Sequence, residues 1–436
     1  LNPVLLWEQP LPDRTLTFAT PGIVRLGDRD KNGQWYLVIG SGPTAITTTS
    51  LSYPASPKIY VFDLKTGELK ATLSIPDASN KAVGDMLSTD LDLPMGDYNV
   101  DDLYFGTYND SSGALYRLRI RNGDAYVTEP TLWTITKVID AGRPVFAAPA
   151  VAHDKNGVRW LYFGTGIYLT SSHTSITNEQ FFGIIETEEC WQGGGTCNVI
   201  NKSTELLDAT NMVFTQGKAV QYSCQCPGNI TISEGFCHVD ASGQIVCPSC
   251  PSGTQVITKI RDAVLTGATG PVATCNNKVE EEAISCIERA IYEYDQNSNT
   301  INYKLRGWKR VLTEKKLYSS PVVTGGAVLA TPFNPTEDVC SAGGDTYLLA
   351  VYYTTGTAYY QPIIRASGGT TGQLGNLVVM VETELVKGPP PTKTSIVLRH
   401  QGEKTTAVTQ VSGGIISTEI TQPNPIKDMF IHWFTK

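Results

Sequence analysis

Phe18-Ala-Thr-Pro-Gly-Ile-Val-Arg25 and Phe146-Ala-Ala-Pro-Ala-Val-Ala-His153 repeat one motif, and Tyr318-Ser-Ser-Pro-Val-Val323 is a third copy. The first two copies are followed by the same turn, Asp-Lys-Asn-Gly, at 30–33 and 154–157. Leu-Tyr-Phe-Gly-Thr then occurs at both 103–107 and 161–165. β-branched and aromatic runs bounded by such turns are typical of β-hairpins. The motif therefore predicts one hairpin that is used several times.

A repeated hairpin cannot bury both faces alone, so the copies must stack on one another. Pro21, Pro149 and Pro321 stand where each copy begins, since the start of a strand tolerates a missing N–H. We therefore expect an all-β protein, a modified β-propeller built from four-stranded blades. With roughly 100 residues set aside as an insertion, the remaining ~335 make seven blades of ~48 residues each. Six or eight blades remain open.

Composition excludes two classes of protein. The chain has 436 residues, a net charge of −8 and no run of Lys or Arg, whereas nucleic-acid binding needs clustered basic residues. Its apolar runs are short and interrupted, so we expect no insertion into a membrane. Because the chain opens at Leu1 rather than Met, we expect a processed or excised fragment.

Ten cysteines mark a distinct segment. Nine lie between Cys190 and Cys286, and the tenth is Cys340. We predict a disulfide-stapled, Cys-rich insertion at 187–287 within a single domain, 1–436, because the segment lacks a core of its own. We expect five disulfides, with Cys340 paired into the insertion. Zinc binding by Cys224-Gln-Cys226 and Cys247-Pro-Ser-Cys250 is the alternative. The only firm helix is expected at 279–290, with an acidic first turn.

An aspartate-rich stretch at 90–102 is the best candidate for a chemical site. Calcium prefers six to eight oxygen ligands, and alternating acidic residues in a short loop supply them at one point. Asp90 and Asp92 alternate in this way, as do Asp97, Asn99 and Asp101. The alternative interpretation is an ordinary solvated acidic turn.

Catalytic motifs are missing from the sequence. None of the five histidines belongs to a His-Glu-x-x-His pattern, and no Gly-x-Ser-x-Gly is present. A quinone-dependent dehydrogenase would suit a propeller, but no dedicated cofactor motif occurs. We therefore expect that the protein is not an enzyme.

Several stretches of the chain together match the pattern of one known family. These stretches are Leu5-Leu-Trp-Glu8 with 21–26, Lys58-Ile-Tyr-Val-Phe-Asp-Leu-Lys-Thr-Gly67, 89–106 with 113–118, Tyr162-Phe-Gly-Thr-Gly-Ile-Tyr-Leu169 with Gln180-Phe-Phe-Gly-Ile184, and Asp338-Val-Cys-Ser-Ala-Gly-Gly344. In them the chain resembles the C-terminal propeller of the PilC/PilY-type adhesins of the type IV pilus tip. The resemblance covers about residues 5–365 and the final Phe430-Ile-His-Trp433, which resembles the closing strand, whereas the Cys-rich insertion has no counterpart in it.

The resemblance implies a calcium-binding, non-catalytic protein at the pilus tip. It would be exported through the periplasm to the cell surface, dock on minor pilins, attach to a host or abiotic surface, and support pilus assembly and control of retraction. Its calcium ligands would be Asp90, Asp92, Asp97, Asn99 through the backbone carbonyl, and Asp101. The loop departs from the family pattern by three extra residues between Asp92 and Asp97, and no Arg-Gly-Asp motif is present.

Two other functions stay open on the sequence alone. One is a periplasmic quinoprotein-like oxidoreductase, which bound quinone absorbance would reveal. The other is a secreted glycan-binding propeller, supported only by 20 tyrosines and 7 tryptophans, which core packing also explains.

Overall fold

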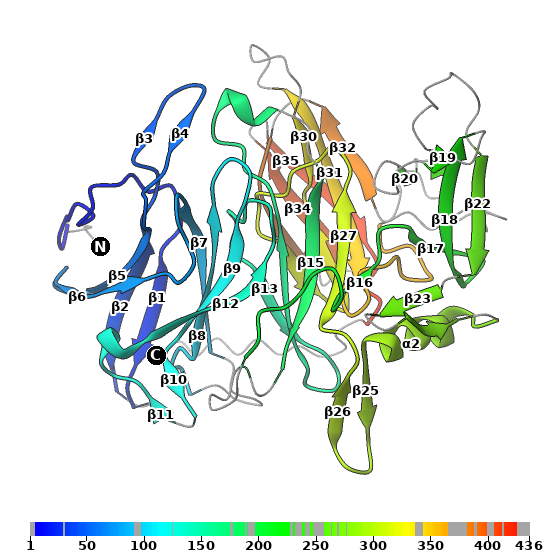
Figure 1. Cartoon of the computed structure of the whole chain (residues 1–436), viewed down its shortest axis with the longest axis horizontal. Helices are drawn as coiled ribbons and strands as arrows, with labels where there is room; N and C mark the ends of the chain where they lie inside the picture. The colour runs from blue at the N-terminus through cyan, green and yellow to red at the C-terminus, as the bar shows by residue number, and fades with distance from the viewer. Residues whose placement is uncertain are drawn as a thin grey trace.

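The structure is a computed structural model of the whole chain (Figure 1). It describes all residues except 1–4, 29–30, 91–96, 124, 175–177, 188–189, 191–196, 227–229, 232–237, 240–244, 247–256, 263, 268–269, 276, 336–342, 365–381, 388–389, 399–404, 412–413 and 425–436. No helix among the described residues is long and apolar enough to cross a membrane.

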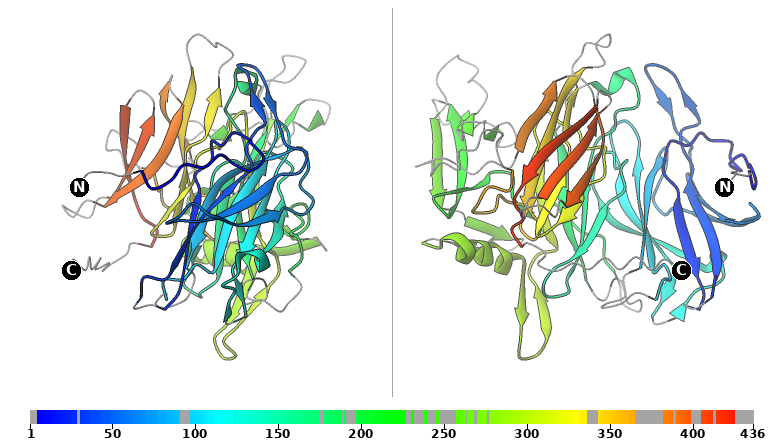
Figure 2. Two further views of the ribbon diagram at one scale, coloured as in Figure 1. Left: turned by 90° about the vertical axis from the view of Figure 1, so that its left-hand side faces the viewer. Right: turned by 180° about the vertical axis from the view of Figure 1, so that it is seen from behind.

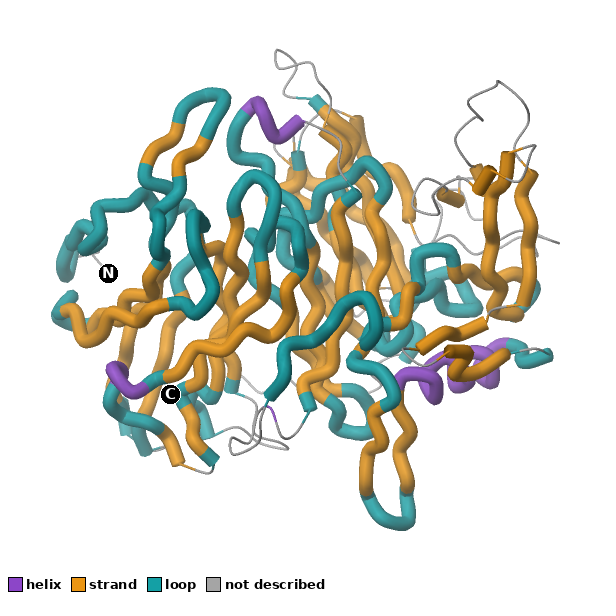
Figure 3. Tube along the Cα trace, viewed as in Figure 1, coloured by secondary structure: helices purple, strands orange, loops and turns teal. Residues whose placement is uncertain are grey.

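Antiparallel sheets that follow one another along the chain form the body of the protein (Figures 1 and 3). The first sheet is β1 (Gly22–Leu26), β2 (Gln34–Gly40), β5 (Lys58–Asp63) and β6 (Leu69–Ser74). The second is β7 (Ala82–Thr89), β8 (Asp102–Tyr108), β9 (Ala114–Arg119) and β12 (Thr134–Asp140). The third is β13 (Ala150–His153), β14 (Arg159–Gly164), β15 (Glu179–Glu186), β27 (Gly307–Leu312) and the parallel β16 (Leu207–Asp208).

Two more sheets complete this series. The fourth is β28 (Val322–Thr324), β29 (Ala327–Ala330), β30 (Phe333–Pro335), β31 (Gly344–Tyr352) and β32 (Glu382–Lys387). The fifth is β33 (Pro391–Leu398), β34 (Thr405–Val411) and β35 (Gly414–Ile420). Short elements decorate the loops: β3 (Ala45–Ile46), β4 (Leu51–Ser52), β10 (Arg121–Asn122), β11 (Ala125–Tyr126), and the 3-10 turns η1 (Pro130–Leu132) and η2 (Ser171–Thr174).

The sheets are the blades of a modified β-propeller, which confirms the predicted fold class. They lie side by side in Figure 1, and the left panel of Figure 2 shows the last sheets, in orange and red, to one side of the first ones, in blue. Each copy of the repeated motif begins a blade, because Pro21, Pro149 and Pro321 directly precede β1, β13 and β28. Five blades lie in the described part of the chain, so the count of seven rests on the length arithmetic alone.

The glycine of the Leu-Tyr-Phe-Gly-Thr string explains why that string recurs, and Gly40 is its equivalent at the end of β2. In three blades it ends or nearly ends the second strand and faces the blade that follows. A Cβ atom at that place would lie within 2.3 Å of the next blade, so only glycine permits the close approach. The three pairs are Gly40 with Val83, Gly106 with Val145, and Gly164 with Leu317.

A backbone hydrogen bond accompanies each of these contacts. The residue after the glycine accepts a bond from the N–H of the residue that the glycine faces, so consecutive blades are joined at equivalent points. The bonds are Val83 N–H to Ser41 O (2.8 Å), Val145 N–H to Thr107 O (3.1 Å) and Leu317 N–H to Thr165 O (2.8 Å). The same short string of residues thus builds a strand and connects two blades.

A long segment, 187–306, separates two strands that lie next to each other in the third blade. β15 pairs with β27, with Phe181 opposite Arg310. The segment contains β17 (Met212–Thr215), β18 (Lys218–Cys226), β19 (Ile230–Thr231), β20 (His238–Val239), β21 (Ile245–Val246), β22 (Ile257–Asp262), β23 (Val264–Gly267), β24 (Gly270–Thr274), α2 (Glu280–Ile291), β25 (Tyr292–Asp295) and β26 (Thr300–Tyr303). It lies at one end of the fan, and the β25–β26 hairpin projects from it (Figure 1). The predicted insertion, 187–287, falls within this segment.

Helix α2 agrees with the helix expected at 279–290. Three glutamates occupy its first turn, where the positive end of the helix dipole favours carboxylates. Its buried face includes Ala283, Ile284 and Ile287, which belong to the same core cluster as Trp160 and Trp308 of the third blade. The helix therefore fastens the segment to the propeller body.

Disulfides confirm the predicted chemistry of this segment where it is described. Cys190 is bonded to Cys197, and Cys275 is bonded to Cys286 on α2. The side chains of the other six cysteines, Cys340 among them, lie outside the described residues, so the expected total of five disulfides stays a prediction.

Candidate cation-binding loop

The predicted calcium ligands lie in the loop from 90 to 101, called here the aspartate loop, which joins β7 to β8. Both strands belong to the second blade, and Thr89 pairs with Asp102 where they meet. A rigid sheet therefore holds both ends of the loop. Asp90, Asp97, Asn99 and Asp101 are described, whereas Asp92 lies outside the described residues.

Asp97 and Asp101 converge on one hydroxyl group. Tyr126, in the short strand β11, donates toward Asp97 Oδ1 at 3.2 Å and Asp101 Oδ1 at 3.0 Å. Two of the predicted ligands therefore point toward the same place, as a shared cation would require.

Asp90 and Asn99 have other roles in the loop. Asp90 Oδ2 accepts the backbone N–H of Tyr98 at 2.8 Å, which closes the base of the loop. Asn99 Oδ1 accepts from Arg25 Nη1 at 3.1 Å and from the Gly27 N–H at 2.8 Å. The Asn99 side chain thus ties the aspartate loop to the first blade, so the carbonyl is the group left for the predicted ligand role.

Two arginines bring positive charge to the aspartate loop. Arg121 Nη1 lies 3.0 Å from Asp101 Oδ1, in a pair whose side chains are 16% and 5% exposed. Arg25 is buried and also donates to the carbonyls of Asp28 and Lys31. The loop is therefore less negative than its sequence indicates.

Hydrogen bonds keep Asp97 ionised. Burial would raise the pKa of its carboxyl, but bonds from the Asn99 N–H, the Asn99 amide and Tyr126 outweigh burial and lower the pKa below its usual range. An ionised carboxylate is the form that binds a metal.

These residues fit calcium by the chemistry of their donors. Asp97 and Asp101 supply convergent carboxylate oxygens, and oxygen is the ligand that calcium prefers. No group of three or more potential His, Cys, Asp or Glu ligands occurs among the described residues, a set from which Asp92 is missing. Calcium at this loop would have to displace the Arg121 guanidinium from Asp101.

A second group of charges begins one residue further on. Asp102, Arg117, Arg119, Arg159 and Glu186, called here the buried ionic cluster, lie between the second and third blades on β8, β9, β14 and β15. Arg117 Nη1 lies 2.9 Å from Glu186 Oε1, and these two side chains are 2% and 1% exposed.

Glu186 and Asp102 are held differently within the cluster. Glu186 also accepts the hydroxyl of Tyr104, whereas Asp102 faces Arg119 at 3.5 Å and Arg159 at 3.7 Å. Burial raises the pKa of Asp102 to about 6, although Arg117 opposes the rise. Sequence analysis missed this cluster because its members come from four strands of two blades.

The sequence did contain a signal for two of the loop's missed partners. Asn122-Gly123 is a strong hairpin-turn signal, and the resulting β10–β11 hairpin places Tyr126 opposite Arg121. No sequence signal links Arg25 to Asn99, because Asn99 belongs to the next blade and lies 74 residues away in the chain.

Two of the five histidines have described side chains. His173 Nδ1 accepts the backbone N–H groups of Leu169 and Thr170 at 3.1 Å, and its Nε2 faces Asp110 Oδ1 at 3.3 Å. His153 is the last residue of β13, the first strand of its blade.

No protein-family model matches the chain, and no curated protein matches it. Among solved structures, the C-terminal domain of PilY1 from Pseudomonas aeruginosa is similar, with a TM-score of 0.59 and 14% identity over 95% of this chain and 74% of that one. The chain therefore has the fold that the sequence resemblance implied.

Other propellers are more distant. The PQQ-bound aldose sugar dehydrogenase of Streptomyces coelicolor gives a TM-score of 0.25 at 12% identity, covering 93% of this chain and 96% of that one. The Cellvibrio cellulosa α-L-arabinanase complexed with arabinohexaose gives 0.30 at 8% identity, covering 93% and 91%. TM-scores this low carry no argument about function.

Proposed function

We propose that this chain is the propeller module of a type IV pilus tip protein, without catalytic activity. The observation that carries the proposal is the likeness to the PilY1 C-terminal domain along nearly the whole chain. The disulfides Cys190–Cys197 and Cys275–Cys286 agree with export through the periplasm to the cell surface, because disulfides persist in oxidising compartments.

Calcium binding at the aspartate loop is the next part of the proposal. Asp97 and Asp101, together with Asp90, Asp92 and the Asn99 carbonyl, would hold the ion. Its charge would offset the repulsion between carboxylates that the loop brings together. Convergence of Asp97 and Asp101 on Tyr126 supports this assignment.

Docking on minor pilins would follow from an ordered aspartate loop. Bound calcium would favour one conformation of the loop and hence one surface for a pilin partner. Through that contact the module would support pilus assembly and attachment to a host or abiotic surface, and it would oppose retraction while calcium is bound.

A binding experiment tests the proposal directly. The purified chain is mixed with the minor pilins of its own organism in calcium and in chelator, and complexes are captured. We expect capture in calcium and weaker capture in chelator. Asp97→Asn with Asp101→Asn should abolish the calcium dependence, and Glu68→Gln, on an exposed pair with Lys70, is the matched control. Absence of binding in both conditions would contradict the assignment to the pilus tip.

The proposed lack of catalysis has its own test. A quinoprotein-like oxidoreductase would carry a bound quinone with visible absorbance, and it would oxidise a sugar or alcohol when loaded with the cofactor. We expect neither absorbance nor turnover from this chain.

A further inference from the structure

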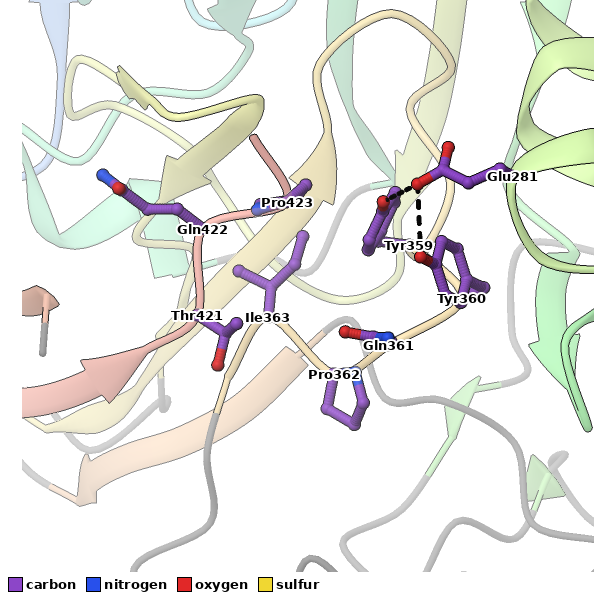
Figure 4. A pocket seen from close by; sticks show the side chains of 9 residues that line it. All are labelled: Glu281, Tyr359, Tyr360, Gln361, Pro362, Ile363, Thr421, Gln422 and Pro423. Atoms are coloured by element: carbon purple, nitrogen blue, oxygen red, sulfur yellow. Dashed lines mark hydrogen bonds between the residues drawn. The ribbon is translucent and has the colours of Figure 1, made fainter. Parts of the chain in front are cut away.

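A small pocket lies where the segment 187–306 meets the propeller body (Figure 4). Its volume is about 150 Å³, which suits one ring-sized group rather than a drug-sized ligand of roughly 300–1,000 Å³. The lining residues are Glu281 of α2, then Tyr359, Tyr360, Gln361, Pro362, Ile363, Thr421, Gln422 and Pro423. We call this the tyrosine pocket.

The walls of the tyrosine pocket are held in place. Gln422 Nε2 donates to Thr324 Oγ1 at 2.7 Å, and the Thr421 N–H donates to Ile363 O at 2.7 Å. Tyr359 is 5% exposed and stacks on Tyr352 with ring centroids 5.1 Å apart. The pocket is therefore formed before any ligand arrives.

Glu281 joins the two tyrosines in one hydrogen-bonded unit. Its Oε1 accepts the hydroxyls of both Tyr359 and Tyr360, the latter at 3.2 Å. Oε2 points away from these hydroxyls in Figure 4, and no described residue donates to it. In Figure 4 this oxygen lies on the side of Glu281 away from Gln361 and Pro362, so the part of Glu281 that the pocket uses is the oxygen that holds the two tyrosines.

The remaining groups also suit a polyhydroxylated ligand. The rings of Tyr359 and Tyr360 lie with centroids 4.3 Å apart, and Tyr360 is the more exposed of the two. Gln361 is exposed at the edge and presents both an amide donor and an amide acceptor. An aromatic face beside planar groups that donate and accept hydrogen bonds matches the C–H face and the neighbouring hydroxyls of a sugar ring.

The charge of the tyrosine pocket argues against ionic ligands. No basic residue is among the described residues that line it, so these residues offer an anion no counter-charge. The one carboxylate lies in the first turn of α2, where two tyrosine hydroxyls and the positive end of the helix dipole already offset its charge. A cation would therefore gain less binding free energy here than at a carboxylate without such partners.

We infer that the tyrosine pocket is a subsite for one neutral pyranose ring of a glycan. Tyr360 would stack on the ring and Gln361 would hydrogen-bond its hydroxyls, while Glu281 would hold the two tyrosine rings in place. The inference is independent of the assignment to the pilus, because it depends only on contacts between α2 and the propeller body.

Saturation-transfer NMR tests the subsite with methyl glucoside, methyl galactoside, methyl mannoside and N-acetylglucosamine at about 10 mM. We expect at least one of them to receive saturation, with a Kd of about 1–10 mM, because one ring gains little area. Tyr360→Ala should weaken binding about tenfold and Glu281→Gln several-fold. Tyr360→Phe keeps the ring and should stay within about threefold of the wild type.

Two results would overturn the inference. One is the lack of saturation transfer to any of the four sugars, and the other is transfer that Tyr360→Ala leaves unchanged although its near-ultraviolet circular dichroism shows a folded protein. Binding of Nα-acetyl-lysine N-methylamide, whose side-chain ammonium is free, in place of the sugars would assign the pocket to a cation instead. None of these results bears on capture by minor pilins, so the two proposals fail separately.

Discussion

Two groups of charged side chains meet at the start of β8, on neighbouring residues. Asp101 belongs to the aspartate loop, where Arg121 and Tyr126 reach it from a small hairpin at the surface. Asp102 belongs to the buried ionic cluster, where Arg119 and Arg159 face it between two blades. Asp101 and Asp102 are themselves both buried, at 3% and 1% exposed, so the difference lies in their neighbours. The loop reaches solvent through Asp97 and Tyr98. The side chains of Arg117, Arg159 and Glu186 are at most 2% exposed, so the cluster can lose a partner only at the cost of an uncompensated buried charge. Composition does not distinguish these groups, but burial does.

Glu186→Gln should have the largest effect of any single change here. It leaves the guanidinium of Arg117 buried without its closest carboxylate, and breaking a buried pair in this way typically costs about 3–5 kcal/mol. Urea unfolding should show a large fall in the midpoint. Glu68→Gln, whose carboxylate is 64% exposed, is the control and should leave the midpoint unchanged. Equal midpoints for all three proteins would show that the cluster is not the more sensitive region.

Calcium should stabilise the protein through the aspartate loop alone. At a hundredfold excess over Kd, one bound ion adds about 2.7 kcal/mol to the free energy of unfolding. Calorimetry should therefore show a rise in Tm on adding calcium, and Asp97→Ala with Asp101→Ala should abolish that rise without unfolding the protein. A loop that binds no calcium at millimolar concentrations would be a solvated acidic turn.

The effect of Asp102→Asn on the free energy of unfolding should depend on pH. Because the pKa of Asp102 is raised to about 6 in the folded protein, its contribution to stability is present below about pH 4 and is lost as the pH rises toward 6. Relative to the asparagine variant, the wild type should lose about 1–2 kcal/mol over that range. Paired urea titrations at several pH values measure this difference. If the free energy of unfolding of the wild type rose relative to that of the variant with increasing pH, the raised pKa would be contradicted.

Arg121→Gln should have the smallest effect of these changes, and the effect should be on the calcium affinity of the aspartate loop. Arg121 competes with a cation for Asp101 Oδ1, in a pair whose side chains are 16% and 5% exposed. Its removal should therefore raise calcium affinity about two- to fivefold by isothermal titration. Lys65→Gln, a surface change in the first blade, is the matched loss of one charge and should leave the affinity alone. Weaker binding by the Arg121 variant would mean that Arg121 builds the site.

The sequence predicted those features that repeat or that lie close together along the chain. Pro21, Pro149 and Pro321 marked the blade starts, and the two copies of Leu-Tyr-Phe-Gly-Thr lie on the second strands β8 and β14, because each repeat copies a local structure. Helix α2 was visible from its acidic first turn. Asp97 and Asp101 were found together because four residues of loop cannot separate them far.

Contacts between residues of different blades could not be predicted from the sequence in this way. Arg25 meets Asn99, and Glu186 meets Arg117, only after the blades pack against each other. Their separations in sequence carry no periodic signal, since the meeting depends on the register of strands in different sheets. The tyrosine pocket likewise needs α2 to lie against residues near the end of the chain.

The separation of β15 from β27 has a consequence for the order of folding. About 120 residues must be made before the partner of β15 exists, and at roughly 5–20 residues per second this takes about 6–24 s. During that interval the edge of β15 is open to unwanted pairing with other chains. The two disulfides span only 7 and 11 residues of this segment, so by chain entropy they lower the cost of closing it by only about 0.1–0.2 kcal/mol. Protection of the β15 edge must therefore come from the rate at which the rest of the segment is made, and the disulfides act locally within the segment.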